Sequence, residues 1–276
     1  MVGAAGMLGR DLTRIAEEAG HEVAGVDLPE IDITDAGGTE RVAAGHAPDV
    51  VVNCAAFTDV DGAEQREDVA ALVNGDGAGN VAKAARAAGA RVIYISTDYV
   101  FDGEKREPYV ESDPSGPRTA YGRTKLAGEW ATAAGNPNYV IARTAWLFGV
   151  HGRNFVETML GLGAERGELR VVHDQRGSPT WTGHLARALV ELAPAELTGA
   201  VHTAGAGSCS WYEFAVEIFR QAGVDVTVHP VTTAEFPRPA PRPAYSVLAS
   251  ERDGAPRLPD WREGLAGYLA ERAVAR

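Results

Sequence analysis

The chain has 276 residues, of which 45% are hydrophobic, and its formal net charge at pH 7 is −12. This apolar content is sufficient for a buried core, and the acidic balance without a basic stretch argues against a nucleic-acid partner. No apolar run approaches the roughly 20 residues that cross a bilayer, and no cationic-then-apolar leader is present, so we expect a cytoplasmic globular protein with no membrane contact.

Cysteine and histidine spacing gives no sign of a metal site. The two cysteines, Cys54 and Cys209, form no CxxC pair, and the seven histidines show no HExxH pattern. We therefore predict that both thiols pack structurally and that the protein itself binds no metal.

The first half of the chain alternates short aliphatic runs with alanine-rich amphipathic stretches, which is typical of βαβ units and a parallel sheet. The predicted helices span 8–20, 38–47, 69–89 and 120–135, and the predicted strands span 21–27, 49–56, 90–96 and 138–149. The fold class is thus α/β, with a Rossmann-type doubly wound parallel sheet.

After Gly149 the elements become shorter and prolines and aromatic residues more frequent, which predicts a second, smaller α/β domain for the substrate. We assign residues 1–149 to a dinucleotide-binding domain, to which 180–204 returns through a helix over 183–193 and a strand over 199–205. Residues 150–179 and 205–276 form the smaller domain. The proline-rich stretch 236–246 should be an extended surface segment.

The chain opens on a glycine pattern, Gly3-x-x-Gly6-x-x-Gly9, directly before the first predicted helix. Glycines let the backbone approach a pyrophosphate, and the amides of the following helix N-terminus point at its charge. About 20 residues further on, Asp27 ends a predicted strand, where a carboxylate can accept the adenosine ribose hydroxyls. A 2′-phosphate would face that negative charge, which favours NADH over NADPH. The alternative is a surface turn followed by an ordinary strand-end aspartate.

Such a loop normally follows a β-strand, yet the sequence starts almost on the first glycine. The first strand, which would be a central one in this sheet, is therefore predicted to be truncated. Further along, Asp32 and Ile33 fit either a position along the adenine or a simple turn with a helix cap at Thr34 or Asp35.

The predicted strand 90–96 delivers Ser96, Thr97 and Asp98 to the carboxyl edge of the sheet. Tyr121 and Lys125 are four residues apart on a predicted helix and share a face. A nearby ammonium favours the phenolate and lowers the pKa of a tyrosine, as a general acid at a carbonyl requires, and Thr97 can bind the same oxygen. The alternative is an exposed tyrosine and a solvated lysine.

Together, the glycine loop, Thr97 and Tyr121-x-x-x-Lys125 resemble the extended short-chain dehydrogenase/reductase family. More narrowly, the chain is similar over nearly its whole length to the dTDP-4-dehydrorhamnose reductases. The matching stretches are NCAAFTDVDGAE, STDYVFDG, YGRTKLAGE, RTAWLFG, NF, DQRGSPT and FPRPAPRPAYS, of which STDYVFDG and DQRGSPT are the most specific.

This resemblance implies reduction of the 4-keto group of dTDP-4-dehydro-L-rhamnose by NADH or NADPH, with Tyr121 as proton donor. It implies that Lys125 tunes Tyr121 and holds the nicotinamide ribose, and that Thr97 adjusts acidity. The cofactor residues it implies are Gly3, Gly6, Met7, Leu8 and Gly9 at the pyrophosphate, Asp27, Asp32 and Ile33 at the adenosine, and Ala56, Phe57 and Thr58 in the middle. The implied nucleotide-sugar residues are Thr97, Asp98, Trp146, Asn154 and Arg242.

Some of these assignments have structural alternatives, because a strand-end tryptophan such as Trp146 is often plain core and Arg242 could equally be an exposed charge. Some members of the family dimerise around magnesium held by acidic residues. Asp11 and His184 occupy two of those positions here, which argues against a magnesium-bridged dimer and leaves a monomer or a homodimer open.

Competing activities remain within the same fold. A dehydratase would need an Asp-Glu pair after the threonine, whereas Thr97-Asp98 is followed by Tyr99. An epimerase is not excluded by the triad alone, and a ketoreductase for another dTDP-6-deoxysugar, such as dihydrostreptose synthase, would look almost identical. A non-catalytic nucleotide-binding regulatory subunit is a further alternative, against which the intact Thr97, Tyr121 and Lys125 argue.

Overall fold

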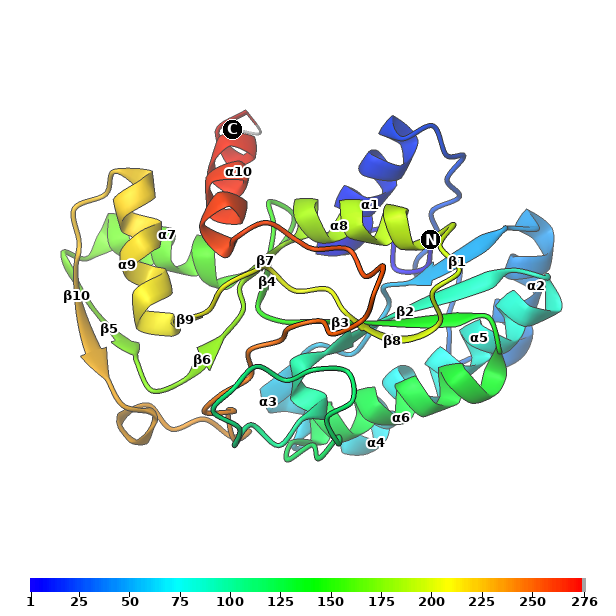
Figure 1. Cartoon of the computed structure of the whole chain (residues 1–276), viewed down its shortest axis with the longest axis horizontal. Coiled ribbons are helices and arrows are strands. Elements are labelled where there is room, and N and C mark those ends of the chain that lie inside the picture. Colours follow the sequence, from blue (N-terminus) through cyan, green and yellow to red (C-terminus); the bar gives the residue numbers. More distant parts are fainter. Residues whose placement is uncertain (275–276) are drawn as a thin grey trace.

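The computed structural model describes residues 1–274 and contains a central parallel sheet in the strand order β1-β2-β3-β8 (Figure 1). These strands span Val50–Asn53 (β1), Arg91–Thr97 (β2), Tyr139–Thr144 (β3) and Gly199–His202 (β8). Every pairing between them is parallel, with Val51 opposite Val92 and Ala142 opposite Val201. The predicted parallel α/β architecture is confirmed.

Residues 1–3 extend this sheet between β1 and the segment around Val26. Val2 forms parallel bridges to Val26 and Asn53, and its backbone exchanges 2.9 Å hydrogen bonds with Val52 and Cys54. The strand predicted over 21–27 is therefore reduced to a single bridge at Val26, because only residues 1–3 lie beside it to pair. The expectation of a longer strand ahead of Val2 stays a prediction.

A groove of about 740 Å³ continues from Met1 between residues 21–26 and β1. Its walls carry apolar side chains, among them Val23, Val42, Val50 and Val52. We call this space the N-terminal groove.

Helices cover both faces of the sheet (Figure 1). On one face α1 (Met7–Glu18) packs against α8 (Thr182–Leu192), and their side chains share a core with the strands that includes Leu12, Leu185 and Val140. The opposite face carries α2 (Ala36–His46), α5 (Ala78–Ala87) and α6 (Ala120–Gly135). Segment 180–204 thus returns to the first-half sheet, since α8 packs on α1 and β8 pairs with β3.

The long helix predicted over 69–89 is interrupted by a π-helical segment. It comprises α4 (Glu67–Ala71), the π-helix η1 (Leu72–Gly77) and α5. The short helix α3 (Val60–Ala63) precedes it. Asn74 lies inside the π-turn and is 1% exposed, and π-turns often accompany functional sites because they redirect one side chain.

The strand predicted over 138–149 is also divided, into β3 and β4 (Leu147–Phe148). Trp146 lies at the break with φ +48°, in the left-handed region that non-glycine residues seldom adopt. Its ring lies against Gly177, where a Cβ would come within 2.4 Å of the indole. β4 then pairs in parallel with β7 (Thr180–Trp181).

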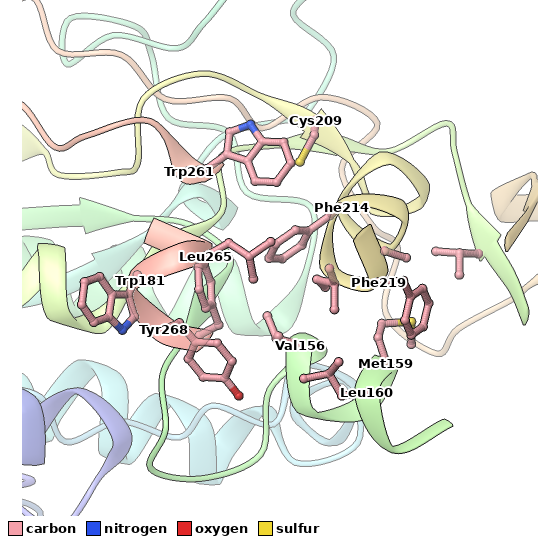
Figure 2. Packing of buried hydrophobic residues seen from close by; sticks show 14 of the residues in the cluster. Val156, Met159, Leu160, Trp181, Cys209, Phe214, Phe219, Trp261, Leu265 and Tyr268 are labelled. Carbon is pink, nitrogen blue, oxygen red and sulfur yellow. The ribbon is translucent and has the colours of Figure 1, made fainter. Parts of the chain in front are cut away.

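The rest of the chain forms a smaller α/β unit beside the sheet (Figure 1). Its elements are α7 (Phe155–Glu165), β5 (Glu168–Val172), β6 (Arg176–Gly177), β9 (Cys209–Ser210), α9 (Trp211–Ala222), β10 (Thr227–Val231), η3 (Thr233–Glu235) and α10 (Trp261–Val274). Figure 2 shows its core, in which Phe214, Leu265, Tyr268 and Val156 converge from α9, α10 and α7. Residues 236–246 contain no helix and only an isolated bridge at Tyr245, as the prolines predict.

Within residues 1–274, none of the helices combines the length and the hydropathy that a bilayer crossing requires.

Candidate active site

A cleft of about 1130 Å³ lies where the carboxyl ends of β1, β2 and β3 meet the loop before α1. Most of the site residues predicted from the sequence line this cleft. These are Gly3, Gly6, Met7, Leu8, Gly9, Asp27, Asp32, Ile33, Ala56, Thr58, Thr97, Asp98, Tyr121, Lys125 and Trp146. Residues from both predicted subsites therefore meet in one space.

The glycine loop is too tightly packed for side chains. Gly3 has φ +79°, and a Cβ on it would lie 2.7 Å from the Ala55 nitrogen. A Cβ on Gly9 would lie 2.2 Å from the Gly3 carbonyl oxygen. The loop leads directly into the N-terminus of α1, so its backbone and the helix amides fit a diphosphate. The close packing of the loop glycines and the helix N-terminus that follows them are the reason why a dinucleotide fits the cleft.

Asp27 and Arg10 meet at Ala5 on the wall of the cleft. The Asp27 carboxylate accepts hydrogen bonds from the Ala5 and Leu28 amides at 2.9 and 2.8 Å, while Arg10 Nε donates to the Ala5 carbonyl at 2.9 Å. Ala5, Arg10, Asp27 and Leu28 all line the cleft, and Leu28 is 71% exposed. Arg10 was not predicted, although it directly follows the last loop glycine.

Asp32 and Ile33 lie on the wall of the cleft, and Asp32 also forms a turn with Thr34. The Asp32 carboxylate accepts hydrogen bonds from the amide and hydroxyl of Thr34 at 2.9 and 2.7 Å. These bonds lower the pKa of Asp32. Ile33 packs so close to Gly77 that a Cβ there would lie 2.8 Å from it.

Asn74 fixes the backbone of the segment 56–58. Its side chain accepts from the Phe57 amide at 2.8 Å and donates to the Phe57 carbonyl at 3.1 Å and to the Thr124 hydroxyl at 3.1 Å. Phe57 is outside the residues that line the cleft and packs instead near Ala63 and Ala120, so its predicted contact with the cofactor has no support from the side chain. Asn74 was missed, because nothing in the sequence marks a π-turn.

Thr97 ends β2, and Tyr121 and Lys125 come from the first turns of α6, which Thr119 caps through a 2.9 Å bond from the Gly122 amide. Burial raises the pKa of Tyr121 to about 12, and a hydrogen bond with Thr97 opposes the rise. Asp98, at the start of η2 (Asp98–Val100), is 2% exposed and accepts a 3.0 Å hydrogen bond from the Thr97 hydroxyl.

The Lys125 ammonium contacts β2 and the Tyr94 ring, and not the Tyr121 phenol that the sequence predicted beside it. Its Nζ donates to the Ile95 carbonyl at 2.7 Å and lies 4.0 Å from the centre of the Tyr94 ring. Burial lowers the pKa of Lys125 to about 7. Burial raises the pKa of Tyr121 to about 12, so the predicted lowering of the Tyr121 pKa is not found in this structure.

A buried ion pair lies one turn beyond Lys125. Arg143 on β3 binds both oxygens of Glu129 at 2.9 and 2.7 Å, and Ser96 donates to the same carboxylate at 2.5 Å. The two charged side chains are 7% and 5% exposed. This pair connects α6 to the two strands that carry the site.

Trp146 forms a parallel stack with Trp211 of α9, with ring centroids 3.4 Å apart. Both rings line the cleft, and Phe155 lies 4.6 Å from Trp211. Trp211 was not predicted, because it lies far along the chain from every motif. The stack supplies an aromatic wall from both structural units.

Asn154 and Arg242 are not among the residues that line the cleft. Asn154 caps α7, accepting from the Glu157 amide at 3.1 Å and donating to the Gly149 carbonyl at 2.8 Å. Arg242 is held by the Asp61 carboxylate and the Ala240 carbonyl, each at 3.0 Å. Their predicted role in substrate binding would require these contacts to change.

Asp11 and His184, the two positions that the resemblance associated with magnesium, each contact protein side chains. Asp11 is fully buried, and its carboxylate accepts a hydrogen bond from the Thr182 hydroxyl. The same carboxylate lies 3.5 Å from the Arg14 guanidinium. The His184 ring meets Trp181 edge-on at 4.8 Å. Within residues 1–274, no three His, Cys, Asp or Glu side chains come together as a metal site.

Comparison with known proteins agrees with this arrangement. The RmlD substrate binding domain model matches residues 1–274. A dTDP-4-dehydrorhamnose reductase of Streptomyces griseus is 44% identical, covering 96% of this chain and 90% of that protein. A probable dTDP-4,6-dihydroxy-2-methyloxan-3-one 4-ketoreductase of Streptomyces antibioticus is 45% identical over 96% and 92%.

Among solved structures, dTDP-4-dehydrorhamnose reductase from Bacillus anthracis in complex with NADP is 40% identical and superimposes with a TM-score of 0.94, covering 98% of this chain and 97% of that one. The family model and these relatives each span almost the whole sequence. The chain therefore belongs to the RmlD substrate binding domain family.

Proposed function

We propose that this protein reduces the 4-keto group of dTDP-4-dehydro-L-rhamnose to give dTDP-L-rhamnose, with a nicotinamide cofactor as reductant. The observation that carries the proposal is that a diphosphate-fitting glycine loop and the Thr97, Tyr121 and Lys125 side chains line the same cleft. The relatives named as dTDP-4-dehydrorhamnose reductases support the substrate class.

When bound, the cofactor supplies the hydride. Tyr121 donates the proton to the oxygen of the carbonyl that is being reduced, and the Thr97 hydroxyl, which opposes the rise in the Tyr121 pKa, orients the phenol. Lys125 holds the nicotinamide ribose beside the site. The Trp146 and Trp211 stack shields the sugar from water and restricts its position.

We propose that both NADH and NADPH bind and that Asp27 favours NADH. Its carboxylate lines the cleft, and in this proposal it accepts the ribose hydroxyls and repels a 2′-phosphate. Arg10, bound to the same Ala5, offers that phosphate a positive charge and keeps NADPH usable. The NADP complex of the Bacillus anthracis relative is consistent with this second part.

We assign the cofactor to residues 1–149 with 180–204, and the nucleotide sugar to 150–179 and 205–276, so that Trp211 reaches the cleft from the substrate side. Asp98 and Trp146 contact the sugar in this assignment. Asn154 and Arg242 take part only if the diphosphate of the substrate displaces their present partners.

A second candidate is a ketoreductase for another dTDP-linked deoxysugar. The Streptomyces antibioticus relative is named for a different dTDP-linked substrate, and at 45% identity it is as similar to this chain as the Streptomyces griseus reductase. The residues of the triad do not separate the two activities.

The deciding experiment mixes the protein with enzymatically prepared dTDP-4-dehydro-L-rhamnose and follows oxidation of NADH and NADPH, with the product identified by NMR. We expect dTDP-L-rhamnose from the wild type and a loss of turnover of at least about 10²-fold in Tyr121→Phe. Unchanged turnover in that variant, with substrate binding intact, would contradict the role of Tyr121. Activity only on a different dTDP-deoxysugar would favour the second candidate.

A further inference from the structure

A loop between β4 and α7 supplies four consecutive residues, 150–153, to the wall of the cleft. We call residues 150–153 the β4–α7 loop. Arg153 is the member of this loop with a permanent charge, and it is exposed. The loop therefore brings a cation to a cleft that fits a dinucleotide.

The Arg153 guanidinium has no partner within residues 1–274, where it forms neither a hydrogen bond nor an ion pair. Two other cationic side chains on the same wall are engaged, since Arg10 donates to the Ala5 carbonyl and Lys125 to the Ile95 carbonyl. A guanidinium can bind a phosphate bidentately. Arg153 is therefore free to bind an anion that enters the cleft.

The β4–α7 loop lies against the first turns of α1. A Cβ on Gly152 would lie 3.8 Å from the Met7 Cβ, and a Cβ on Gly149 would lie 3.2 Å from the Met7 Cγ. Nε2 of His151 lies 3.9 Å from the Asp11 carboxylate, about one turn further along the same helix. Because α1 begins at Met7, the loop lies beside the helix N-terminus that follows the glycine loop.

Asn154 holds this loop in place. Its Nδ2 donates to the Gly149 carbonyl at 2.8 Å and to the Gly152 carbonyl at 3.3 Å. Its Oδ1 accepts from the Glu157 amide at 3.1 Å and so caps α7. The position of Arg153 is therefore set by the backbone on either side of it, which leaves its own side chain available to a ligand.

We propose that Arg153 binds the diphosphate of the nicotinamide cofactor together with the N-terminus of α1, and that Asn154 is the positioning residue that holds the Arg153 loop. This inference rests on the proposed function, because it takes the cleft to hold a nicotinamide dinucleotide. The diphosphate is common to NADH and NADPH. Arg153 should therefore serve both cofactors and leave the choice between them to Arg10 and Asp27.

The contacts of the loop favour the diphosphate of the cofactor over that of the sugar nucleotide. The loop packs on α1, which follows the glycine loop directly. Arg242, the arginine assigned to the sugar nucleotide, is instead held by Asp61 of α3. Arg153 and the positive end of the α1 dipole thus lie on the same part of the cleft wall.

The test measures ligand binding to Arg153→Gln by calorimetry and needs no turnover. ADP-ribose carries the diphosphate of the cofactor without the nicotinamide, and adenosine lacks the diphosphate. We expect the Kd of ADP-ribose and of NADH to rise by about tenfold in Arg153→Gln, and the Kd of adenosine to stay unchanged. Arg166→Gln, at an exposed arginine that follows the last residue of α7, is the matched control and should change none of these constants.

Two outcomes of these titrations would overturn the proposal. Equal affinity of the wild type and Arg153→Gln for ADP-ribose would exclude a contact with the cofactor diphosphate. A larger loss for dTDP than for ADP-ribose would assign Arg153 to the sugar nucleotide. Added salt should also weaken ADP-ribose binding more in the wild type than in Arg153→Gln, because salt screens an exposed pair of charges.

The role of Asn154 is tested with Asn154→Ser, because serine can still cap α7 but cannot donate to both carbonyls. We expect the Kd of ADP-ribose to rise several-fold in this variant, and no further rise when Asn154→Ser is added to Arg153→Gln. Additive losses would mean that Asn154 does not act through Arg153. Arg153→Gln changes an exposed side chain, so the main test stands even if Asn154→Ser is unstable.

The binding and turnover results separate this proposal from the proposed function. A wild type that binds ADP-ribose and NADH but reduces no dTDP-4-keto sugar would overturn the proposed function and leave the Arg153 titrations valid. A wild type that binds neither ADP-ribose nor NADH would overturn both. A wild type that reduces the sugar, with unchanged cofactor affinity in Arg153→Gln, would overturn the role of Arg153 alone.

Discussion

Arg10 and Asp27, which carry opposite charges, both hydrogen-bond to the backbone of Ala5. The Ala5 amide donates to Asp27 at 2.9 Å, and the Ala5 carbonyl accepts from Arg10 at 2.9 Å. Replacing Arg10 with Ala should weaken NADPH binding by about tenfold and leave NADH nearly unchanged, since about 1.4 kcal/mol of phosphate pairing is lost. Asp27→Asn should act in the reverse direction. Fluorescence titration with both cofactors measures the ratio, and equal losses for both in Arg10→Ala would exclude a 2′-phosphate role.

The pKa of Lys125 makes stability depend on pH in a definite direction. Its folded-state pKa is lowered to about 7 from an ordinary value of 10.5, so between these values the unfolded chain binds the proton and the folded chain does not. The free energy of unfolding should therefore rise from pH 7 to pH 9.5, by on the order of 2 kcal/mol from this group. Lys125→Met should lose that rise in urea titrations, whereas the exposed Lys83→Met should keep it.

Replacing only one partner of the Glu129–Arg143 ion pair should strongly lower the free energy of unfolding. Glu129→Gln leaves a guanidinium buried against uncharged groups, and we expect a loss of about 3–5 kcal/mol in the free energy of unfolding. Combining it with Arg143→Met should recover part of the loss. Glu67→Gln is the matched control, because its pair with Arg123 of α6 is about half exposed and should contribute less than about 1 kcal/mol. Equal losses in both single variants would contradict this account.

The stack of Trp146 on Trp211 should matter for the nucleotide sugar more than for the cofactor. Trp211→Ala leaves one face of Trp146 without a partner, and we expect KM for the sugar nucleotide to rise by up to about tenfold while the Kd of NADH changes little. Trp130→Ala, on a 67% exposed residue of α6, should change neither constant. Steady-state kinetics and cofactor titration distinguish the outcomes.

The N-terminal groove should accept an added strand. Fusing about five aliphatic residues ahead of Met1 would let them pair with residues 21–26 and β1, and we expect the melting temperature to rise by at least about 4 °C. A fused run of alternating Asp and Lys is the control, since its charged side chains cannot fill the apolar walls. No gain from the aliphatic run would mean that the groove does not admit a strand.

Regular periodicity is what made the sheet and its helices predictable. The expected helix over 120–135 is α6 to the residue, and the expected strand over 90–96 is β2 shifted by one position. The departures arise where tertiary contacts override local pattern: Trp146 breaks a strand because its ring packs on Gly177, and the strand over 21–27 lacks a partner along most of its length.

Site residues that belong to a sequence motif could be predicted, whereas those that only the folded chain brings together could not. Glycine spacing and Tyr-x-x-x-Lys point to backbone and helix-face geometry that is local in the chain. Trp211 and Arg10 reach the same space from a distant helix and from an exposed side chain. Asn74, in a π-turn, acts on the site indirectly by holding the Phe57 backbone. The direction of the Lys125 ammonium depends on the Ile95 carbonyl, which only the folded structure places beside it.

The return of α8 and β8 to the first-half sheet limits how the chain can be divided. A fragment ending at residue 149 would lose the helix that covers α1 and the strand that pairs with β3, and would expose Leu12 and Val140 to water. Under the proposed division of the chain, recombination at internal loops that keeps residues 180–204 with the first half would exchange the substrate-side segments without removing α8 and β8 from the sheet.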